Sequence, residues 1–159
     1  MIYNVIDVSR HIINYSNKKE YGVSNLKLQK LLYFTQAYFL LTKKETCFYE
    51  RIEAWDLGPV VPVAYREYKQ FGSGNIPTIT YVIERDYDNI WNSKVIPFKD
   101  VIVSEEDKRL TNAVVDKFSE YSAADLVRLT HRQKPWIDAY VPKRNNEITI
   151  DSIEDYFNV

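Results

Sequence analysis

The segment between residues 26 and 42 constrains the fold of this chain more than any other, because it predicts a helix that is apolar on most sides. Two stripes of apolar side chains follow helical spacing, one formed by Leu28, Leu31, Leu32 and Phe39 and the other by Phe34, Ala37, Tyr38 and Leu41. A helix with so wide an apolar surface must be covered on more than one side. We therefore expect it to be the central helix of the fold.

Capping residues and helix breakers predict further helices around this central one. Ser24 or Asn25 suits the position before it, because the side-chain oxygen accepts from the first free backbone N–H groups. Pro59 suits the first position of the following helix, and Gly72 suits its end. The other expected helices cover residues 5–17, residues 104–121, residues 122–130, a short stretch from Pro135 and a last turn capped by Asp151. In the helix over residues 104–121, the inner face is expected to carry Leu110, Val114, Phe118 and Tyr121.

Extended segments are few and short. Residues 48–55 and 78–83 have strand-like content, residues 86–93 resemble a polar loop, and residues 148–150 form a further candidate strand. A small irregular or hairpin region is therefore expected between residues 73 and 100. The chain shows no internal repeat, low-complexity segment or linker composition. We predict a mainly α (α+β) fold, with residues 1–159 forming a single compact helical domain that has a small β element.

Net charge, cysteine content and hydropathy limit which partners and which cellular compartment are expected for this chain. The formal net charge is −1, which gives little electrostatic basis for nucleic-acid binding. Cys47 is the only cysteine, so no intramolecular disulfide can form, as is usual in a reducing compartment. The first residues lack the pattern of a signal peptide, and no apolar run is long enough to span a membrane. We expect a cytoplasmic protein.

Signatures of catalysis and of metal binding are absent from the sequence. It contains no HExxH, paired CxxC, phosphate-binding loop, GxGxxG or GxSxG motif. His11 and His131 fall on different predicted helices without the spacing of zinc ligands. Cys47 and His131 would need to be adjacent to act as nucleophile and base, and a space-filling role for the thiol is the simpler interpretation. We predict no metal, no cofactor and no enzymatic activity.

Two aromatic segments are the strongest candidates for function. Residues 53–60 (EAWDLGPV) join an extended stretch to a turn, with Trp55 immediately before the turn. Trp55 is either an interface residue or part of the core, since aromatic side chains serve both roles. Residues 130–136 (THRQKPW) form a basic turn that ends in Trp136. This turn either receives an acidic surface or places cations at the end of a helix, where they are favoured.

Together these segments resemble the Panacea domain family, also described as SocA-like antitoxins or phage-associated GepA-like proteins. The resemblance rests on residues 26–34 (LKLQKLLYF), 52–62 (IEAWDLGPVVP) and 65–72 (YREYKQFG), followed by Thr130-His131 and Pro135-Trp136. The most specific part contains Glu53, Trp55, Gly58, Pro59 and Val60, with Pro135 and Trp136 completing the pattern. Two departures are Gln133, where the family pattern has an acidic residue, and residues 81–95, which resemble a variable insertion.

The resemblance implies an antitoxin that is encoded beside a toxin gene, often in a prophage or mobile element, and that binds a cognate toxin protein. The side chains expected to contact this partner are Trp55, Asp56, Tyr65, Arg66, Tyr68 and His131. Aromatic and arginine side chains often provide most of the binding energy at such interfaces.

Alternative functions remain open at this stage. An adaptor or chaperone would deliver the toxin to a protease, and toxin abundance would then fall when the protein is present. A transcriptional regulator would need a basic recognition helix, and none stands out. An enzyme is the fourth alternative, and binding of a small cofactor or a metal by the purified protein would favour it.

Overall fold

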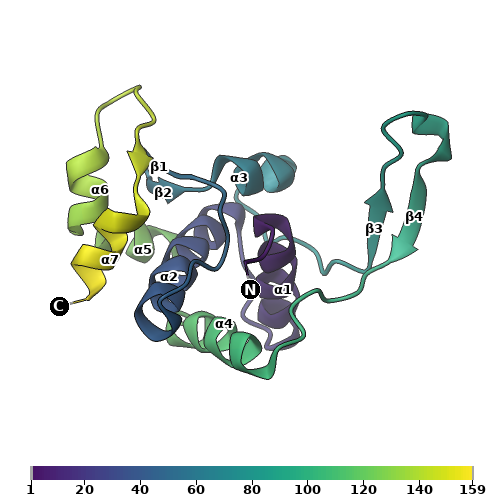
Figure 1. Ribbon diagram of the computed structural model, residues 1–159, viewed down its shortest axis with the longest axis horizontal. Coiled ribbons are helices and arrows are strands. Elements are labelled where there is room, and N and C mark those ends of the chain that lie inside the picture. The colour runs from purple at the N-terminus through teal and green to yellow at the C-terminus, as the bar shows by residue number, and fades with distance from the viewer. Residues whose placement is uncertain (1, 159) are drawn as a thin grey trace.

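The structure is a computed structural model that describes residues 2–158, shown in Figure 1. Helices dominate these residues, and the strands are short, which confirms the predicted mainly α (α+β) class. The α-helices are α1 (Val5–Lys18), α2 (Asn25–Lys43), α3 (Pro62–Tyr68), α4 (Glu105–Lys117), α5 (Ala123–Thr130), α6 (Lys134–Ala139) and α7 (Ile150–Phe157). The strands are β1 (Ile52–Trp55), β2 (Gly58–Val60), β3 (Tyr81–Glu84), β4 (Lys94–Pro97) and β5 (Glu147–Ile148), and the 3-10 helices are η1 (Lys69–Phe71) and η2 (Ile90–Asn92).

Helix α2 is the centre of the hydrophobic core, as its sequence predicts. It packs against α1, α3, α4, α5 and α7 and against strand β2, and Figure 1 shows it in the middle of the helical body. Residues 28–37 of this helix are all buried, on every side of its axis. The helix begins after Ser24, whose side chain accepts from the backbone N–H of Lys27. Covering α2 on all sides is what organises the other helices around it.

Most of the predicted helix boundaries are confirmed, but the end of α4 and the cap of α7 differ from the prediction. Ser104 and Ser122 cap α4 and α5, and Ser122 forms a reciprocal capping box with Asp125. Helix α4 ends at Lys117, so Tyr121 lies beyond it and is exposed rather than on an inner face. The cap of α7 is Thr149, not Asp151, because the Thr149 hydroxyl accepts from the N–H of Ser152.

Strands β2, β1 and β5 form a small antiparallel sheet against α2. Here the prediction that Pro59 starts a helix is wrong. Residues 58–60 return antiparallel to β1, with Ala54 opposite Pro59, and α3 begins three residues later at Pro62. Strand β2 is at the edge of the sheet, where a proline is tolerated because its missing N–H is not needed for pairing. The strands are also shorter than predicted, since β1 covers only residues 52–55 and β5 ends at residue 148.

A second, two-stranded sheet projects from the helical body. Strands β3 and β4 pair antiparallel from Tyr81 opposite Pro97 to Glu84 opposite Lys94. Figure 1 shows this hairpin extending away from the helices, joined to them by the segments before β3 and after β4. Of the two alternatives expected between residues 73 and 100, an irregular region or a hairpin, the structure shows the hairpin. Within residues 2–158, no helix is both long and apolar enough to cross a membrane.

Candidate functional site at the Gly-Pro turn

Residues 55–60, here called the Gly-Pro turn, reverse the chain between β1 and β2. Trp55 pairs with Gly58, so Asp56 and Leu57 connect the two strands. Gly58 has a φ of +105°, a conformation that favours glycine. A Cβ atom at Gly58 would lie 2.7 Å from Cε of Lys30 and 2.9 Å from Oγ1 of Thr130. Glycine therefore allows both the backbone conformation and the close approach of the turn to α2 and α5.

Lys30 lies directly beneath this turn with a fully buried side chain. Its Nζ donates a hydrogen bond of 3.0 Å to the carbonyl oxygen of Pro59. Burial lowers the pKa of Lys30 to about 7, because taking an ammonium group out of water penalises the charged form. Lys30 thus ties the Gly-Pro turn to the central helix. Lys30 was not among the residues selected from the sequence. The signal that could have found it is the apolar surface on most sides of this helix, which leaves few positions exposed to solvent.

Three aromatic rings from the C-terminal part of the chain hold the outer side of the turn. His131, Trp136 and Tyr140 stack in sequence, with ring centroids 4.1 Å and 4.4 Å apart. Each ring also hydrogen-bonds to the turn. Nε2 of His131 lies 2.9 Å from the backbone oxygen of Asp56, and Nε1 of Trp136 donates to the backbone oxygen of Trp55 at 2.8 Å. The Tyr140 hydroxyl donates to the Asp56 carboxylate, and this bond raises the pKa of Tyr140.

Removing one of these bonds provides a test of the aromatic stack. We expect Trp136→Phe to lower the free energy of unfolding by about 1 kcal/mol, since stacking is kept while the N–H donor to Trp55 is lost. Urea unfolding followed by circular dichroism measures this value. Tyr140→Phe is the matched control, and its effect should be smaller because that hydrogen bond is exposed to water. Equal stability of Trp136→Phe and the unmodified protein would show that the bond does not hold the turn.

A shallow apolar pocket of about 360 Å³ opens beside the Gly-Pro turn. The Trp55 and Tyr65 rings meet edge to face in its wall, with centroids 5.0 Å apart. Leu57, at the tip of the turn, is 54% exposed and also lines this turn pocket. The remaining lining residues are Leu26, Gln29, Asp56, Val60, Lys143 and Asn145. The pocket is suited to an apolar side chain from another molecule, because rigid aromatic walls bind such groups with little loss of entropy.

Some residues of the predicted motif stabilise the fold around the turn, and others lie at the surface. Glu53 accepts a hydrogen bond from Nε1 of Trp55 and pairs with Arg51 at 3.0 Å, which fixes the indole. Pro135 is buried, and Gln133 accepts from the Tyr33 hydroxyl inside the core. Of the predicted contact residues, the structure brings Trp55, Asp56 and Tyr65 to the turn pocket, and it places Arg66 exposed on α3.

His131 and Tyr68 have other positions than the sequence suggested. His131 is the C-cap of α5 and is engaged by Asp56 and Trp136, which favours the structural interpretation of the basic turn. Tyr68 is only 4% exposed and does not line the turn pocket. Tyr68 therefore lies away from the turn pocket, and its contact with a partner stays a prediction.

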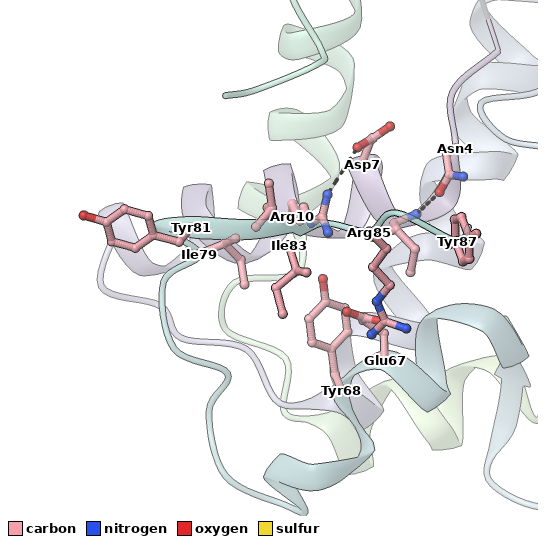
Figure 2. A pocket seen from close by; sticks show the side chains of 12 residues that line it. Asn4, Asp7, Arg10, Glu67, Tyr68, Ile79, Tyr81, Ile83, Arg85 and Tyr87 are labelled. Carbon is pink, nitrogen blue, oxygen red and sulfur yellow. Dashed lines mark hydrogen bonds and ion pairs between the residues drawn. The ribbon is translucent and has the colours of Figure 1, made fainter. Parts of the chain in front are cut away.

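Tyr68 instead lines a separate hollow of about 550 Å³ between α1, α3 and the β3–β4 hairpin. Figure 2 shows charged side chains around it, with Arg10 and Asp7 joined by an ion pair of 3.7 Å and Arg85 reaching toward Glu67. Burial is the main cause of the raised pKa of Asp7 in this wall. The lining is mostly polar, unlike that of the turn pocket.

Cys47, the candidate nucleophile in the sequence, is placed unfavourably for catalysis. Burial raises the pKa of the Cys47 thiol, which disfavours the nucleophilic thiolate, and the residue is fully buried. Its backbone N–H donates to Gln36 in the core. Among residues 2–158, no three His, Cys, Asp or Glu side chains are grouped so that they could hold a metal ion.

Comparison with known proteins connects this site to a family. The family model described as "Antitoxin SocA-like, Panacea domain" matches residues 28–137, a range that includes Lys30, the Gly-Pro turn and Trp136. Antitoxin SocA of Caulobacter vibrioides (strain NA1000 / CB15N) is 36% identical over 115 residues, which cover 72% of this chain and 58% of that protein. The chain therefore spans less than two thirds of this relative's length. No solved structure matches the chain. By its sequence match across the central helix, the turn and the start of the aromatic stack, the chain belongs to the SocA-like antitoxin family with the Panacea domain.

Proposed function

We propose that this protein is an antitoxin that neutralises a partner toxin by binding it directly, without catalysis. The similarity to a protein named Antitoxin SocA supports the role, and the family match covers most of the chain. The partner would be a toxin protein encoded near the gene for this chain. A stoichiometric binder needs a shaped and partly apolar surface rather than a reactive group.

The observation that carries this proposal is the turn pocket. Trp55, Leu57 and Tyr65 present apolar surface around it, and the turn behind them is fixed by Lys30 from below and by the aromatic stack from outside. A surface that is ordered before binding loses less conformational entropy when the partner docks. The site is therefore suited to tight binding of an apolar side chain that projects from the toxin.

The test is co-expression of this chain with the product of the neighbouring gene. We expect growth to be restored and the two proteins to purify together. Leu57→Ser should weaken the complex about tenfold or more without changing the melting temperature, because Leu57 is largely exposed in the free protein. Affinity is measured by calorimetry on purified proteins. Trp55→Ala is a second variant, to be interpreted only if its circular dichroism shows a normal fold.

Val103→Ser is the matched control, because Val103 is 64% exposed and does not line the turn pocket. Full affinity of Leu57→Ser would remove the turn pocket from the interface. The toxin level in the same cells separates two mechanisms. A stable complex supports neutralisation by binding, whereas loss of the toxin would support an adaptor that delivers it to a protease.

A further inference from the structure

The β3–β4 hairpin, here called the arm (residues 81–97), carries the most exposed apolar surface in the described structure. Six of its large apolar side chains are at least 59% exposed: Tyr81, Ile83, Tyr87, Ile90, Trp91 and Val95. Trp91 and Tyr87 are more than nine tenths exposed. Contiguous exposed apolar surface of this kind is typical of a site that another molecule covers.

The strand register gathers part of this surface on one face. Ile83 pairs with Val95, and Tyr81 pairs with Pro97, so these four side chains project from the same side of the two-stranded sheet. All four are exposed. The arm therefore presents an apolar face along its length as well as an apolar end.

Side chains of α1 hold the base of the arm. Asn14 accepts from the backbone N–H of Ile79 and donates to its carbonyl oxygen, and Asn17 donates to the hydroxyl of Thr78. On the returning side, Nδ1 of His11 lies 2.6 Å from the Asp100 carboxylate. These three helical residues are spaced three apart, so they lie along one face of α1. The arm leaves the body in a defined direction.

The end of the arm is also organised by its own hydrogen bonds. The Asp86 carboxylate accepts from the N–H groups of Asp88 and Asn89, and the Asn89 side chain accepts from the N–H of Trp91. This fixes the 3-10 turn η2, which contains Ile90 and Trp91. Together with Tyr87, these two side chains form what we call the arm tip. An aromatic anchor held in position before binding is the usual centre of an interface hot spot.

The charge around the arm tip is acidic. Residues 86–93, which connect the two strands at the end of the arm, contain two acidic side chains, Asp86 and Asp88, and no basic one. Glu84 lies opposite Lys94 in the strand pairing, so this flanking pair adds no net charge. Figure 2 shows Arg85 directed back toward Glu67 on α3 rather than toward the tip. A partner surface that accepts this tip is therefore expected to combine an apolar pocket with a basic rim.

We infer that the arm tip inserts into an apolar pocket with a basic rim on the partner toxin. This inference rests on the proposed function and adds a second contact surface to the turn pocket. Aromatic side chains bury roughly 150–250 Å² each, and a standard interface takes about 800 Å² from each partner. Tyr87 and Trp91 at the arm tip thus supply about half of one partner's share of such an interface. A second copy of this chain is a poorer occupant, because symmetric pairing would bring two acidic tips together.

The experiment measures the affinity of full-length variants for the purified product of the neighbouring gene. Trp91→Ser and Ile90→Ser are expected to raise the Kd about tenfold or more each. Tyr49→Ser is the matched control, since Tyr49 is 72% exposed but lies outside the arm, and its Kd should change less than about twofold. Asp88→Lys should slow association, and the effect should shrink at high salt, because screening weakens exposed charge pairs.

The outcomes separate this inference from the proposed function. If the unmodified protein neither binds the product nor restores growth, the proposed function fails and the inference fails with it. If the unmodified protein binds while the arm variants keep full affinity, only the inference is overturned. Sedimentation of the protein alone tests the other occupant. A dimer that the arm variants convert to a monomer, with toxin affinity unchanged, would assign the arm to self-association instead.

Discussion

Replacement of Gly58 by alanine should destabilise this protein by about 2–4 kcal/mol, measured as the free energy of unfolding in urea. Two costs add. A φ of +105° is strained for any residue with a Cβ atom, and the added methyl group would lie 2.7 Å from Cε of Lys30. Lys30 is constrained at this point, because its side chain is fully buried and its Nζ donates to the carbonyl oxygen of Pro59.

Gly72→Ala separates these two costs. Gly72 also has a positive φ, +56°, but an added Cβ atom would meet nothing within 4 Å. We expect it to cost about 1–2 kcal/mol from its backbone conformation alone, with φ +56° and ψ −129°. If both variants lost the same stability, the close approach of the Gly-Pro turn to Lys30 and Thr130 would not contribute, and the packing described for this site would be wrong.

The second large effect is a dependence of stability on pH that originates at Lys30. Its pKa in the folded protein is about 7, well below the ordinary value of 10.5. Between these values the unfolded chain binds more protons than the folded one, so stability rises as pH increases through this range. Each pH unit over which the two states differ by one bound proton is worth about 1.4 kcal/mol. Because Lys30 in the folded protein is about half protonated at pH 7, the gain between pH 7 and pH 9 should be about 2 kcal/mol.

Lys30→Met isolates this contribution, because methionine fills a similar volume without a titratable group. Urea unfolding of both proteins at pH 6.5, 7.5 and 9 gives the two slopes. Other groups change stability in the same range, and His11 acts in the opposite direction. Burial disfavours its charged form, but the hydrogen bonds to Asp100 and Asn112 outweigh burial and raise its pKa, so its contribution is lost as pH rises. Because both proteins contain His11 and the other titrating groups, the difference between their slopes isolates the contribution of Lys30. Parallel slopes would contradict the assignment to Lys30.

The helical framework was predictable from the sequence because its signals are local. The two apolar stripes of α2 and the serines before α4 and α5 act within one or two turns, and the structure has them where expected. Pro59 misled the prediction because proline suits both a helix start and an edge strand. Pairing of β2 with β1 decided between the two, and such pairing is a tertiary contact.

The candidate site was predictable in its parts but not in its assembly. Trp55 and Trp136 were both selected from the sequence, yet nothing local indicates that the indole of one binds the backbone of the other across 81 positions. Lys30 was missed because a lysine in a helix is normally solvated. Tyr140 was missed because no motif distinguishes it, and its bond to Asp56 exists only after the chain has folded.

The contacts between α1 and the arm separate the residues that hold the arm from the residues at its tip. Asn14 recognises backbone groups of Ile79, and the anchoring contacts of His11, Asn14 and Asn17 involve residues at the foot of the arm rather than its end. Substitutions at Tyr87, Ile90 or Trp91 would therefore change the inferred contact surface without removing the contacts that hold the arm. On the inferred binding mode, a few substitutions at the arm tip would change which toxin is bound without requiring compensating changes in the hydrophobic core.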